Sequence, residues 1–426
     1  MANTRDEISV LIQRIQDFHA QDAMRSLGDA IKKKKKWFGI VLYIVDGLSK
    51  SLIGNCFLIC LVVLFYRVFR RGEPGCDVFF YGMSENNLRA FSMLEKCFPD
   101  GLPGQCSING KSFSIFFRLK VLFSIFDILT VSKVMSERQC GKPLARLQAI
   151  IGCAAYLLYK GSRFLDETKV VCVASDHSPI CQALLFQSEL RGVKTCYIQH
   201  APVTENFPPL NYDLSILYDQ ASYESYVSSA RINKCVNKGE VLLLSPFSSD
   251  FVWPKLEGDE FFVGLCLSFL PRLDVLAEFI KEIKSNDRVS GLLIRRHPRC
   301  KMDLSVLKGV RGVVIQKKDE NISDFFEAVD LVVVPNSGVA IESLHNGKPT
   351  FYLPGSDYIE DDYYGFVAAG VIPSIDVGMS CDSERIEKFF NDAWAETYGR
   401  YDETAKRTIP EMRSEVRKAF LNIYGN

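Results

Sequence analysis

A histidine among arginines, in the run Arg295 to Arg299 (RRHPR), is where the residue types of this 426-residue chain first point to chemistry. The run follows the apolar segment Gly291 to Arg295, which reads as a strand, and Pro298 prevents that strand from continuing. Guanidinium groups at a strand end suit a phosphate group, which they bind through charge-assisted hydrogen bonds. His297 can protonate or hydrogen-bond an oxygen of a leaving phosphate. We therefore expect a phosphate site here.

A second chemical feature lies between Leu331 and Pro354. Its apolar start, Leu331 to Val334, predicts a strand buried on both faces of a parallel sheet, and a short helical pattern follows after a turn of small residues. Backbone N–H groups at such a turn favour phosphate. Glu342, one turn into the helix, can accept two hydrogen bonds from a ribose diol. The alternative is a buried β-α-β unit in which Gly338 and Gly347 only serve turns.

Strands and helices alternate over most of the chain, which is the pattern of parallel sheets covered by helices. A loop-like segment, Ser248 to Gly258, separates two such series. The predicted fold class is therefore α/β, with two Rossmann-like domains and a hydrophobic helical N-terminal region. The predicted strands are Asp77 to Tyr81, Lys169 to Ala174, Lys194 to Ile198, Leu214 to Leu217, Val241 to Leu244, Phe261 to Cys266, Gly291 to Arg295, Val313 to Gln316, Leu331 to Val334 and Thr350 to Leu353.

These motifs carry a family resemblance. The order His297-Pro298, then Asn336-Ser337-Gly338 and Glu342, then Gly347-Lys348-Pro349 resembles the nucleotide-sugar signature of GT-B glycosyltransferases. The His-Pro pair is similar to that of bacterial sialyl- and polysialyltransferases that use a CMP-linked sugar, of capsule and lipopolysaccharide Kdo transferases, and of teichoic-acid glycerophosphotransferases. The resemblance covers roughly Lys169 to Pro354.

The resemblance implies roles for single residues. His297, Arg295 and Arg299 would hold the leaving phosphate. Glu342 would hold the ribose. Small residues would complete the donor site through hydrogen bonds to the phosphates, and these are Asn336, Ser337, Gly338 and Ser343.

The catalytic base is not fixed by the resemblance, because the short carboxylate-Gly motif of those families is absent from this sequence. An inverting transfer needs a group that takes the proton of the acceptor hydroxyl. Asp176 and His200 each follow a predicted strand, and Glu205 lies in the loop after His200. We rank Asp176 first, His200 second and Glu205 third. The alternatives are an Asx turn for Asp176 and a buried structural histidine for His200.

Composition excludes other classes of function. The chain has 51 basic and 51 acidic residues, so no net charge favours a nucleic-acid partner. Its 14 cysteines include no C-x-x-C pair, which suits reduced thiols better than a zinc site or a disulfide framework. Asp361 and Asp362 are adjacent in a loop rather than spaced as metal ligands, and we interpret them as solvated or as a rim contact. We therefore expect no metal and no cofactor.

The N-terminal region is unusually apolar. Five lysines at 32–36 precede Trp37, and a second apolar run, Ser51 to Tyr66, is too short to span a bilayer alone. The alternatives are a single anchor, a hairpin in one leaflet and a buried helical pair, of which we favour membrane attachment. The apolar segment Phe113 to Val131 is expected to form one helix, buried in the core or lying along a membrane, with core burial favoured.

We therefore predict three parts: a helical membrane-associated region (1–75), an N-terminal Rossmann-like acceptor domain (76–250) with an insertion at 98–167, and a C-terminal Rossmann-like nucleotide-sugar-binding domain (251–426) with closing helices. The predicted function is a membrane-associated, inverting, metal-independent glycosyltransferase at the cytoplasmic face of the inner (plasma) membrane. It would transfer a sugar from a nucleotide donor, a CMP-sugar favoured, to a cell-surface glycan or lipid-linked acceptor. The alternatives are a nucleotide-sugar 2-epimerase and a non-catalytic scaffold of a glycan-assembly complex.

Overall fold

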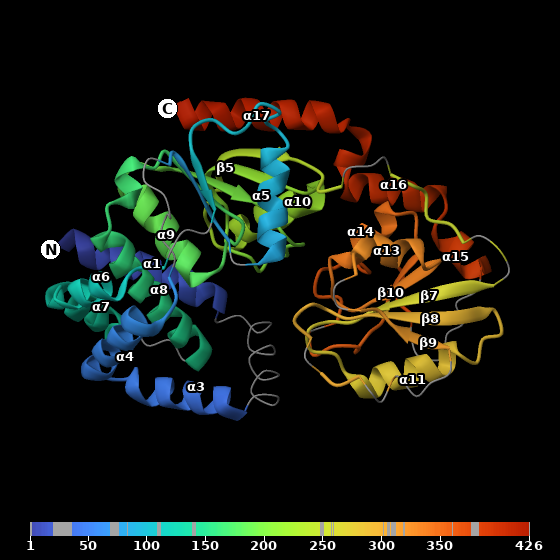
Figure 1. The fold of residues 1–426 in the computed structure, drawn as a ribbon, viewed down its shortest axis with the longest axis horizontal. Coiled ribbons are helices and arrows are strands. Elements are labelled where there is room, and N and C mark those ends of the chain that lie inside the picture. The colour runs from blue at the N-terminus through green and yellow to red at the C-terminus, as the bar shows by residue number, and fades with distance from the viewer. Residues whose placement is uncertain are drawn as a thin grey trace. The chain divides into compact units, whose positions relative to one another are not determined.

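The chain forms two compact units in a computed structural model (Figure 1). The first comprises Met1–Tyr218, Ser222–Pro246 and Ile409–Asn426, and the second comprises Asp219–Ala221 and Phe247–Thr408. The structure describes residues 2–19, 36–68, 76–82, 84–108, 112–138, 142–247, 251–256, 258, 260–300, 302–304, 307, 312–317, 320–359, 361–375 and 383–425. The lysines at 32–35 lie outside the described residues, and so do residues 248–250 and 257 of the expected linker.

The first unit contains a parallel sheet and a large group of helices. Its strands are β1 (Val78–Tyr81), β2 (Cys106–Ile108), β3 (Val170–Val173), β4 (Lys194–Ile198), β5 (Asn211–Leu217) and β6 (Lys238–Leu243). Its helices are α1 (Ala2–His19), α3 (Lys36–Leu48), α4 (Leu52–Phe65), α5 (Glu85–Glu95), α6 (Ile115–Leu122), α7 (Ile125–Glu137), α8 (Pro143–Gly161), η1 (Phe164–Glu167), α9 (Pro179–Leu190), α10 (Gln220–Ile232) and α17 (Ile409–Gly425).

The six strands lie in the order β2-β1-β3-β4-β5-β6, and every described pairing is parallel. Alternate side chains face opposite sides of the sheet: Val78 and Phe80 share a core with α5 and α17, whereas Phe79 and Tyr81 share one with α8 and α9. The predicted α/β class is confirmed. The strand β2 was not predicted, because its three residues lie within the segment assigned to an insertion.

The C-terminal helix belongs to the first unit, although the sequence assigned 251–426 to the second domain. α17 contacts β5 and β6, and its buried residues Met412, Val416 and Phe420 join the core that contains Val78 and Phe80. This buried apolar stripe is the reason why the helix packs there.

The second unit has five strands: β7 (Phe261–Cys266), β8 (Val289–Arg295), β9 (Val313–Ile315), β10 (Leu331–Val334) and β11 (Thr350–Tyr352). They lie in the order β11-β10-β7-β8-β9, again with parallel pairings. The accompanying helices are α11 (Leu273–Ile283), α13 (Ile322–Glu327), α14 (Val339–His345), α15 (Ser383–Phe389), α16 (Asp392–Tyr401) and η2 (Glu403–Lys406). Gly347 ends the α14 turn with a φ of 71°, the left-handed conformation expected of a helix-ending glycine.

The apolar segment Phe113 to Val131 forms two helices instead of the single helix predicted. α6 ends at Leu122 and α7 starts at Ile125, because Ser124 leaves the helical conformation with a ψ of 56°. One face of each helix is buried, as Val121 and Ile128 show, while the opposite face is exposed. No described helix is long and apolar enough to cross a membrane.

A buried arginine holds this helical group together. The Arg118 side chain, in the middle of α6, is almost fully buried. Its Nε donates to the Phe113 carbonyl at 2.9 Å, and its Nη1 donates to the carbonyls of Val63 at 2.9 Å and Tyr66 at 2.6 Å. Its Nη2 donates to Ser112 Oγ at 2.8 Å. One guanidinium therefore satisfies carbonyl groups at the end of α4 and ties that helix to α6.

Replacing Arg118 is expected to destabilise the first unit. Arg118→Ala leaves several buried carbonyls without a donor and should lower the free energy of unfolding by about 2–4 kcal/mol. The matched control is Lys120→Ala in the same helix, where the exposed side chain should contribute less than about 0.5 kcal/mol. Urea unfolding followed by circular dichroism measures both changes, and equal effects of the two variants would contradict the role of Arg118.

Candidate active site

The strand order of each sheet indicates where a ligand binds. In open parallel sheets the binding crevice lies beyond the carboxyl ends of the two neighbouring strands from which the chain leaves in opposite directions. In the first sheet these strands are β1 and β3, and in the second they are β7 and β10. The loop after β3 carries Asp176, and the loop after β10 carries Asn336 to Gly338. In each unit, residues predicted from the sequence therefore follow one of the two strands that border the expected binding crevice.

Asp176 is 1% exposed, and both of its carboxylate oxygens have partners. Its Oδ1 lies 2.8 Å from Nδ1 of His177, and its Oδ2 accepts a hydrogen bond of 2.7 Å from the Tyr226 hydroxyl. The carboxylate has no exposed face with which to take a proton from a substrate. Its position instead orients the neighbouring imidazole, as carboxylates do in catalytic triads.

His177 is the group that the carboxylate presents. Its side chain is 31% exposed, and its ring makes an edge-to-face contact with Phe207 at 5.3 Å. A carboxylate beside Nδ1 stabilises the neutral tautomer in which Nδ1 carries the proton of the ring. The basic lone pair of the imidazole is then on Nε2. An oriented, partly exposed imidazole of this kind can act as a general base. The sequence had led us to assign this role to Asp176, one residue earlier.

Two buried tyrosines complete this network. The hydroxyls of Tyr226 and Tyr197 lie 3.0 Å apart. Burial, and then the charge of Asp176, hold the pKa of both phenols well above the ordinary value. Both phenols therefore stay protonated, and Tyr226 remains a donor to Asp176 across the physiological pH range.

The other two candidate bases have no such support. Gln199, which precedes His200, bridges two strand ends: its Nε2 donates to Ser222 Oγ at 2.8 Å, and its Oε1 accepts from the Tyr218 N–H at 2.8 Å. His200 itself is half-buried in the following loop. Glu205 is exposed in the next turn. No described contact pairs the Glu205 side chain with an orienting group.

In the second unit His297 lies in the loop after β8. Its Nδ1 accepts a hydrogen bond of 3.1 Å from the Arg299 backbone N–H, so the neutral ring carries its proton on Nε2. Burial, and then the Arg299 charge, lower the pKa of His297 to about 4. At neutral pH His297 is therefore a neutral hydrogen-bond donor rather than an acid.

Phe269, in the loop after β7, brings these groups together. Its ring lies 6.0 Å from the His297 ring, and the Arg299 guanidinium lies 5.2 Å from its centroid. The result is a cation and an N–H donor held beside an aromatic face. No sequence pattern marked Phe269, because a single aromatic residue in a loop has no periodicity.

The Arg295 side chain, at the end of β8, makes its described hydrogen bonds to a different part of the second unit. Its Nη1 donates to the side chain of Gln316 and, at 3.2 and 3.3 Å, to the carbonyls of Glu320 and Asn321. These contacts join the end of β8 to Gln316 and to the two residues that precede α13. The predicted phosphate contact of Arg295 stays a prediction.

The turn after β10 holds the remaining donor candidates. Asn336 is bonded to the segment that follows β11, since its Oδ1 accepts from the Tyr363 N–H at 2.7 Å. Ser337 Oγ accepts from the Val339 N–H at 3.3 Å, and Gly338 is the N-cap of α14. Glu342 is half-buried in the first turn. Ser343 is 0% exposed and accepts from the Thr350 hydroxyl at 2.8 Å, so it packs the helix against β11 instead of facing the turn.

Two carboxylates in the segment after β11 accept hydrogen bonds from backbone N–H groups of the same segment. Asp361 Oδ1 accepts from the Gly355 N–H at 2.8 Å, and Asp362 Oδ2 accepts from the Ala368 N–H at 2.8 Å. Asp361 is exposed, which agrees with the expected solvated position, whereas Asp362 is half-buried. Burial raises the pKa of Asp357 to about 6. Within the described part of the chain, no group of three His, Cys, Asp or Glu side chains could hold a metal ion.

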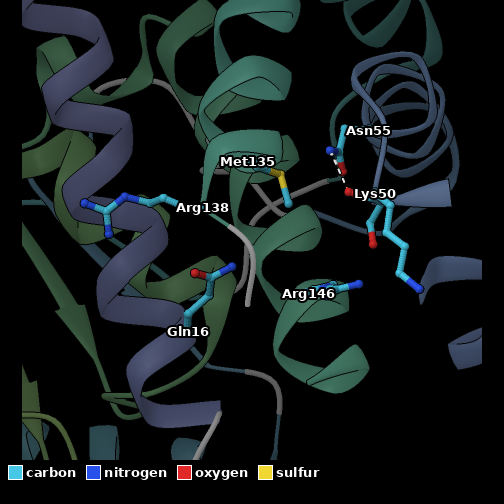
Figure 2. Close-up of a pocket in the computed structure, with 7 residues that line it drawn as sticks. Gln16, Lys50, Asn55, Met135, Arg138 and Arg146 are labelled. Carbon is cyan, nitrogen blue, oxygen red and sulfur yellow. Dashed lines mark hydrogen bonds between the residues drawn. The ribbon is translucent and has the colours of Figure 1, made fainter. Parts of the chain in front are cut away.

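A small hollow lies among the helices of the first unit, away from these residues. Figure 2 shows Gln16 and Arg138 on one side and Lys50, Asn55 and Arg146 on the other. Lys50 and Arg146 both pair with Asp46, at 2.9 and 2.7 Å. None of the predicted site residues lines the hollow.

Comparisons with known proteins assign no family. No family model and no curated protein matches the chain. It is similar to a chain of the GtfA/B complex (14% identity, 64% of this chain, 60% of that chain, TM-score 0.35). It is also similar to a wall teichoic acid polymerase TagF variant, with 11% identity over 94% of this chain and 99% of that chain and a TM-score of 0.42. A third similar structure is Methanocaldococcus jannaschii UDP-GlcNAc 2-epimerase in complex with UDP-GlcNAc and UDP, with 10% identity over 81% of this chain and 99% of that chain and a TM-score of 0.47.

The low pKa of His297 predicts a pH dependence of stability. The unfolded state binds the proton near the ordinary value of 6.5 and the folded state only near 4, so the stability contributed by neutral His297 is lost as pH falls through this window. His297→Gln should therefore flatten the decline in unfolding free energy between pH 7 and pH 5. Asp357 contributes in the opposite sense, because its raised pKa adds stability as pH falls from about 6 towards 3.8.

Urea unfolding at several pH values measures these slopes, and Asp357→Asn is the control of opposite sign. NMR of the labelled imidazole Cε1 measures the titration of His297 directly. A midpoint at or above 6 for His297 would show that the ring is not held in its neutral form.

Proposed function

We propose that the chain is a membrane-associated, inverting, metal-independent glycosyltransferase. It transfers a sugar from an activated nucleotide to a cell-surface glycan or lipid-linked acceptor at the cytoplasmic face of the plasma membrane. The observation that supports this proposal is the pair formed by buried Asp176 and part-exposed His177 beyond β3. That pair supplies the base that the sequence left unassigned.

In the proposed reaction His177 Nε2 takes the proton of an acceptor hydroxyl as its oxygen attacks the anomeric carbon of the donor sugar. The bond between that carbon and the donor phosphate oxygen breaks, and the nucleotide leaves with the electron pair. The imidazolium formed at His177 is stabilised by the Asp176 carboxylate at 2.8 Å. Attack from the face opposite the leaving group inverts the anomeric configuration.

The second unit holds the donor in this proposal. His297 donates from Nε2 to a phosphate oxygen, and Arg299 offsets the charge that develops on the leaving nucleotide. The turn at Ser337 and Gly338 adds backbone donors, and Glu342 accepts from the ribose. A CMP-linked sugar is the favoured donor because the His297-Pro298 pair resembles the motif of transferases that use such donors.

Nucleotide binding tests the proposal without knowledge of the acceptor. A thermal-shift screen of CMP, UDP, GDP and CDP-glycerol should show stabilisation by one nucleotide, which reaches about 2.7 kcal/mol at a hundredfold excess over its dissociation constant. Release of that nucleotide from its sugar donor should require a glycan acceptor. Isomerised donor would indicate an epimerase, and failure to bind any nucleotide would contradict an enzyme of this class.

The base is tested by paired amide variants. His177→Gln should lower kcat about 10²- to 10⁴-fold, since the proton acceptor is lost, with little change in nucleotide binding. Asp176→Asn should also lower kcat, because the imidazole loses the carboxylate that orients it and stabilises its charged form. Full activity of His177→Gln together with inactivity of Glu205→Gln would move the role to Glu205.

A further inference from the structure

Four helices of the first unit expose apolar side chains to an unusual degree. α4 contacts α3, α6 and α7, so the four helices form one group (Figure 1). We call the exposed large hydrophobic residues of these helices and their connection the apolar face. They are Trp37, Ile40, Tyr43, Ile44, Leu52, Ile53, Phe57, Leu61, Phe65, Ile115, Phe116, Leu119, Phe123, Ile125, Phe126 and Leu129. A soluble monomer rarely exposes so large a group of contiguous apolar side chains.

Three phenylalanines in α6, in its connection to α7 and in the first turn of α7 are among the most exposed residues of the apolar face. Phe116 is 81% exposed, Phe123 86% and Phe126 80%. The opposite sides of the same helices are buried in the core through Val121 and Ile128. Both sides of these helices are therefore apolar, whereas a helix at a water-facing surface normally carries polar residues on its outer side.

The charges around the apolar face favour an anionic partner. The acidic residues of these helices are neutralised: Asp46 pairs with Lys50 and Arg146, Asp127 pairs with Lys160 at 2.8 Å, and Glu137 pairs with Arg5. By contrast Lys120 and Lys133 are exposed and make no ion pair with any described residue. In the sequence, the lysines at 32–36 directly precede Trp37. The uncompensated charge beside the apolar face is positive.

We infer that the apolar face docks in the plane of one leaflet of a bilayer that contains anionic lipids, with Phe116, Phe123 and Phe126 inserted and Lys120 and Lys133 at the headgroups. This inference deepens the proposed function and rests on it for the lipid-linked acceptor. The longest of these helices, α4, has 14 residues and is about 21 Å long, whereas the hydrocarbon core is about 30 Å thick. In-plane docking therefore fits the helix lengths.

A lipid surface accounts for the residue types better than a protein partner does. Lysine is depleted in protein interfaces, whereas at a membrane its stem lies along apolar surface and its ammonium reaches the headgroups. Lys120 has this position, since it lies in α6 between exposed Leu119 and Phe123. Aromatic and aliphatic residues on one side with lysines at the border are typical of helices that lie in a membrane interface.

The test is sedimentation of the full chain with vesicles of phosphatidylglycerol and phosphatidylcholine in equal parts. The triple variant Phe116→Ser, Phe123→Ser, Phe126→Ser should bind at least about tenfold more weakly, because three apolar side chains no longer leave water. The double variant Lys120→Glu, Lys133→Glu should lose affinity for these vesicles and not for pure phosphatidylcholine. The matched control is Leu88→Ser, Ile232→Ser, Val236→Ser, which removes exposed apolar residues elsewhere in the same unit and should bind as the wild type does.

Undiminished vesicle binding by the phenylalanine variant, with an unchanged unfolding curve, would overturn the inference. So would a wild-type dimer in the absence of lipid that the same variant converts to a monomer, because a second copy would then cover the apolar face. Transfer to a water-soluble acceptor distinguishes the two proposals. A phenylalanine variant that keeps this transfer but loses vesicle binding supports docking, whereas a wild type that binds vesicles and transfers nothing refutes only the glycosyltransferase.

Discussion

A carboxylate removed from water has to be satisfied on both oxygens, and the candidate site depends on how Asp176 meets this requirement. Ionised carboxylates are costly to bury unless donors surround them. Tyr226 occupies one oxygen and His177 the other. Because burial keeps the tyrosine protonated, the tyrosine contact is fixed. The imidazole is then held in one tautomer with its second nitrogen on the opposite side of the ring, which is how a buried charge becomes an oriented base.

In the second unit, burial and a neighbouring positive charge determine the protonation state of the candidate histidine. His297 is kept neutral by burial and by the neighbouring arginine charge, and its Nδ1 is occupied by a backbone N–H. A neutral donor and a permanent cation are suited to an anion that gains charge during a reaction, because neither has to change protonation state. The two units thus hold histidines of opposite character, one arranged to accept a proton and one to donate a hydrogen bond.

The N-terminal helices show how a packed helical group can expose apolar side chains on its outer face. Their inner faces share a core with the sheet, and Arg118 ties α4 to α6 through backbone carbonyls. Gly152 permits α1 to approach α8 closely, since a Cβ there would meet Ile15 Cδ1 at 2.2 Å. None of these contacts involves the outer faces of the helices. The exposed phenylalanines are therefore available for another role.

The sequence by itself determined the α/β class, ten of the strands within a few residues, and the places where strands end in polar residues, because buried parallel strands read as uninterrupted apolar runs. Tertiary structure alone decided the rest. β2 is too short for a periodic signal, the break between α6 and α7 lies inside a continuous apolar run, and α17 packs on a sheet far from it in sequence. The choice between Asp176 and His177 as the base could not be made from the sequence either. It depends on the hydrogen bond from Tyr226, 50 residues away, which holds Asp176 in the interior. Local pattern reports which residues prefer to be buried, whereas long-range contacts decide what each buried group is bonded to.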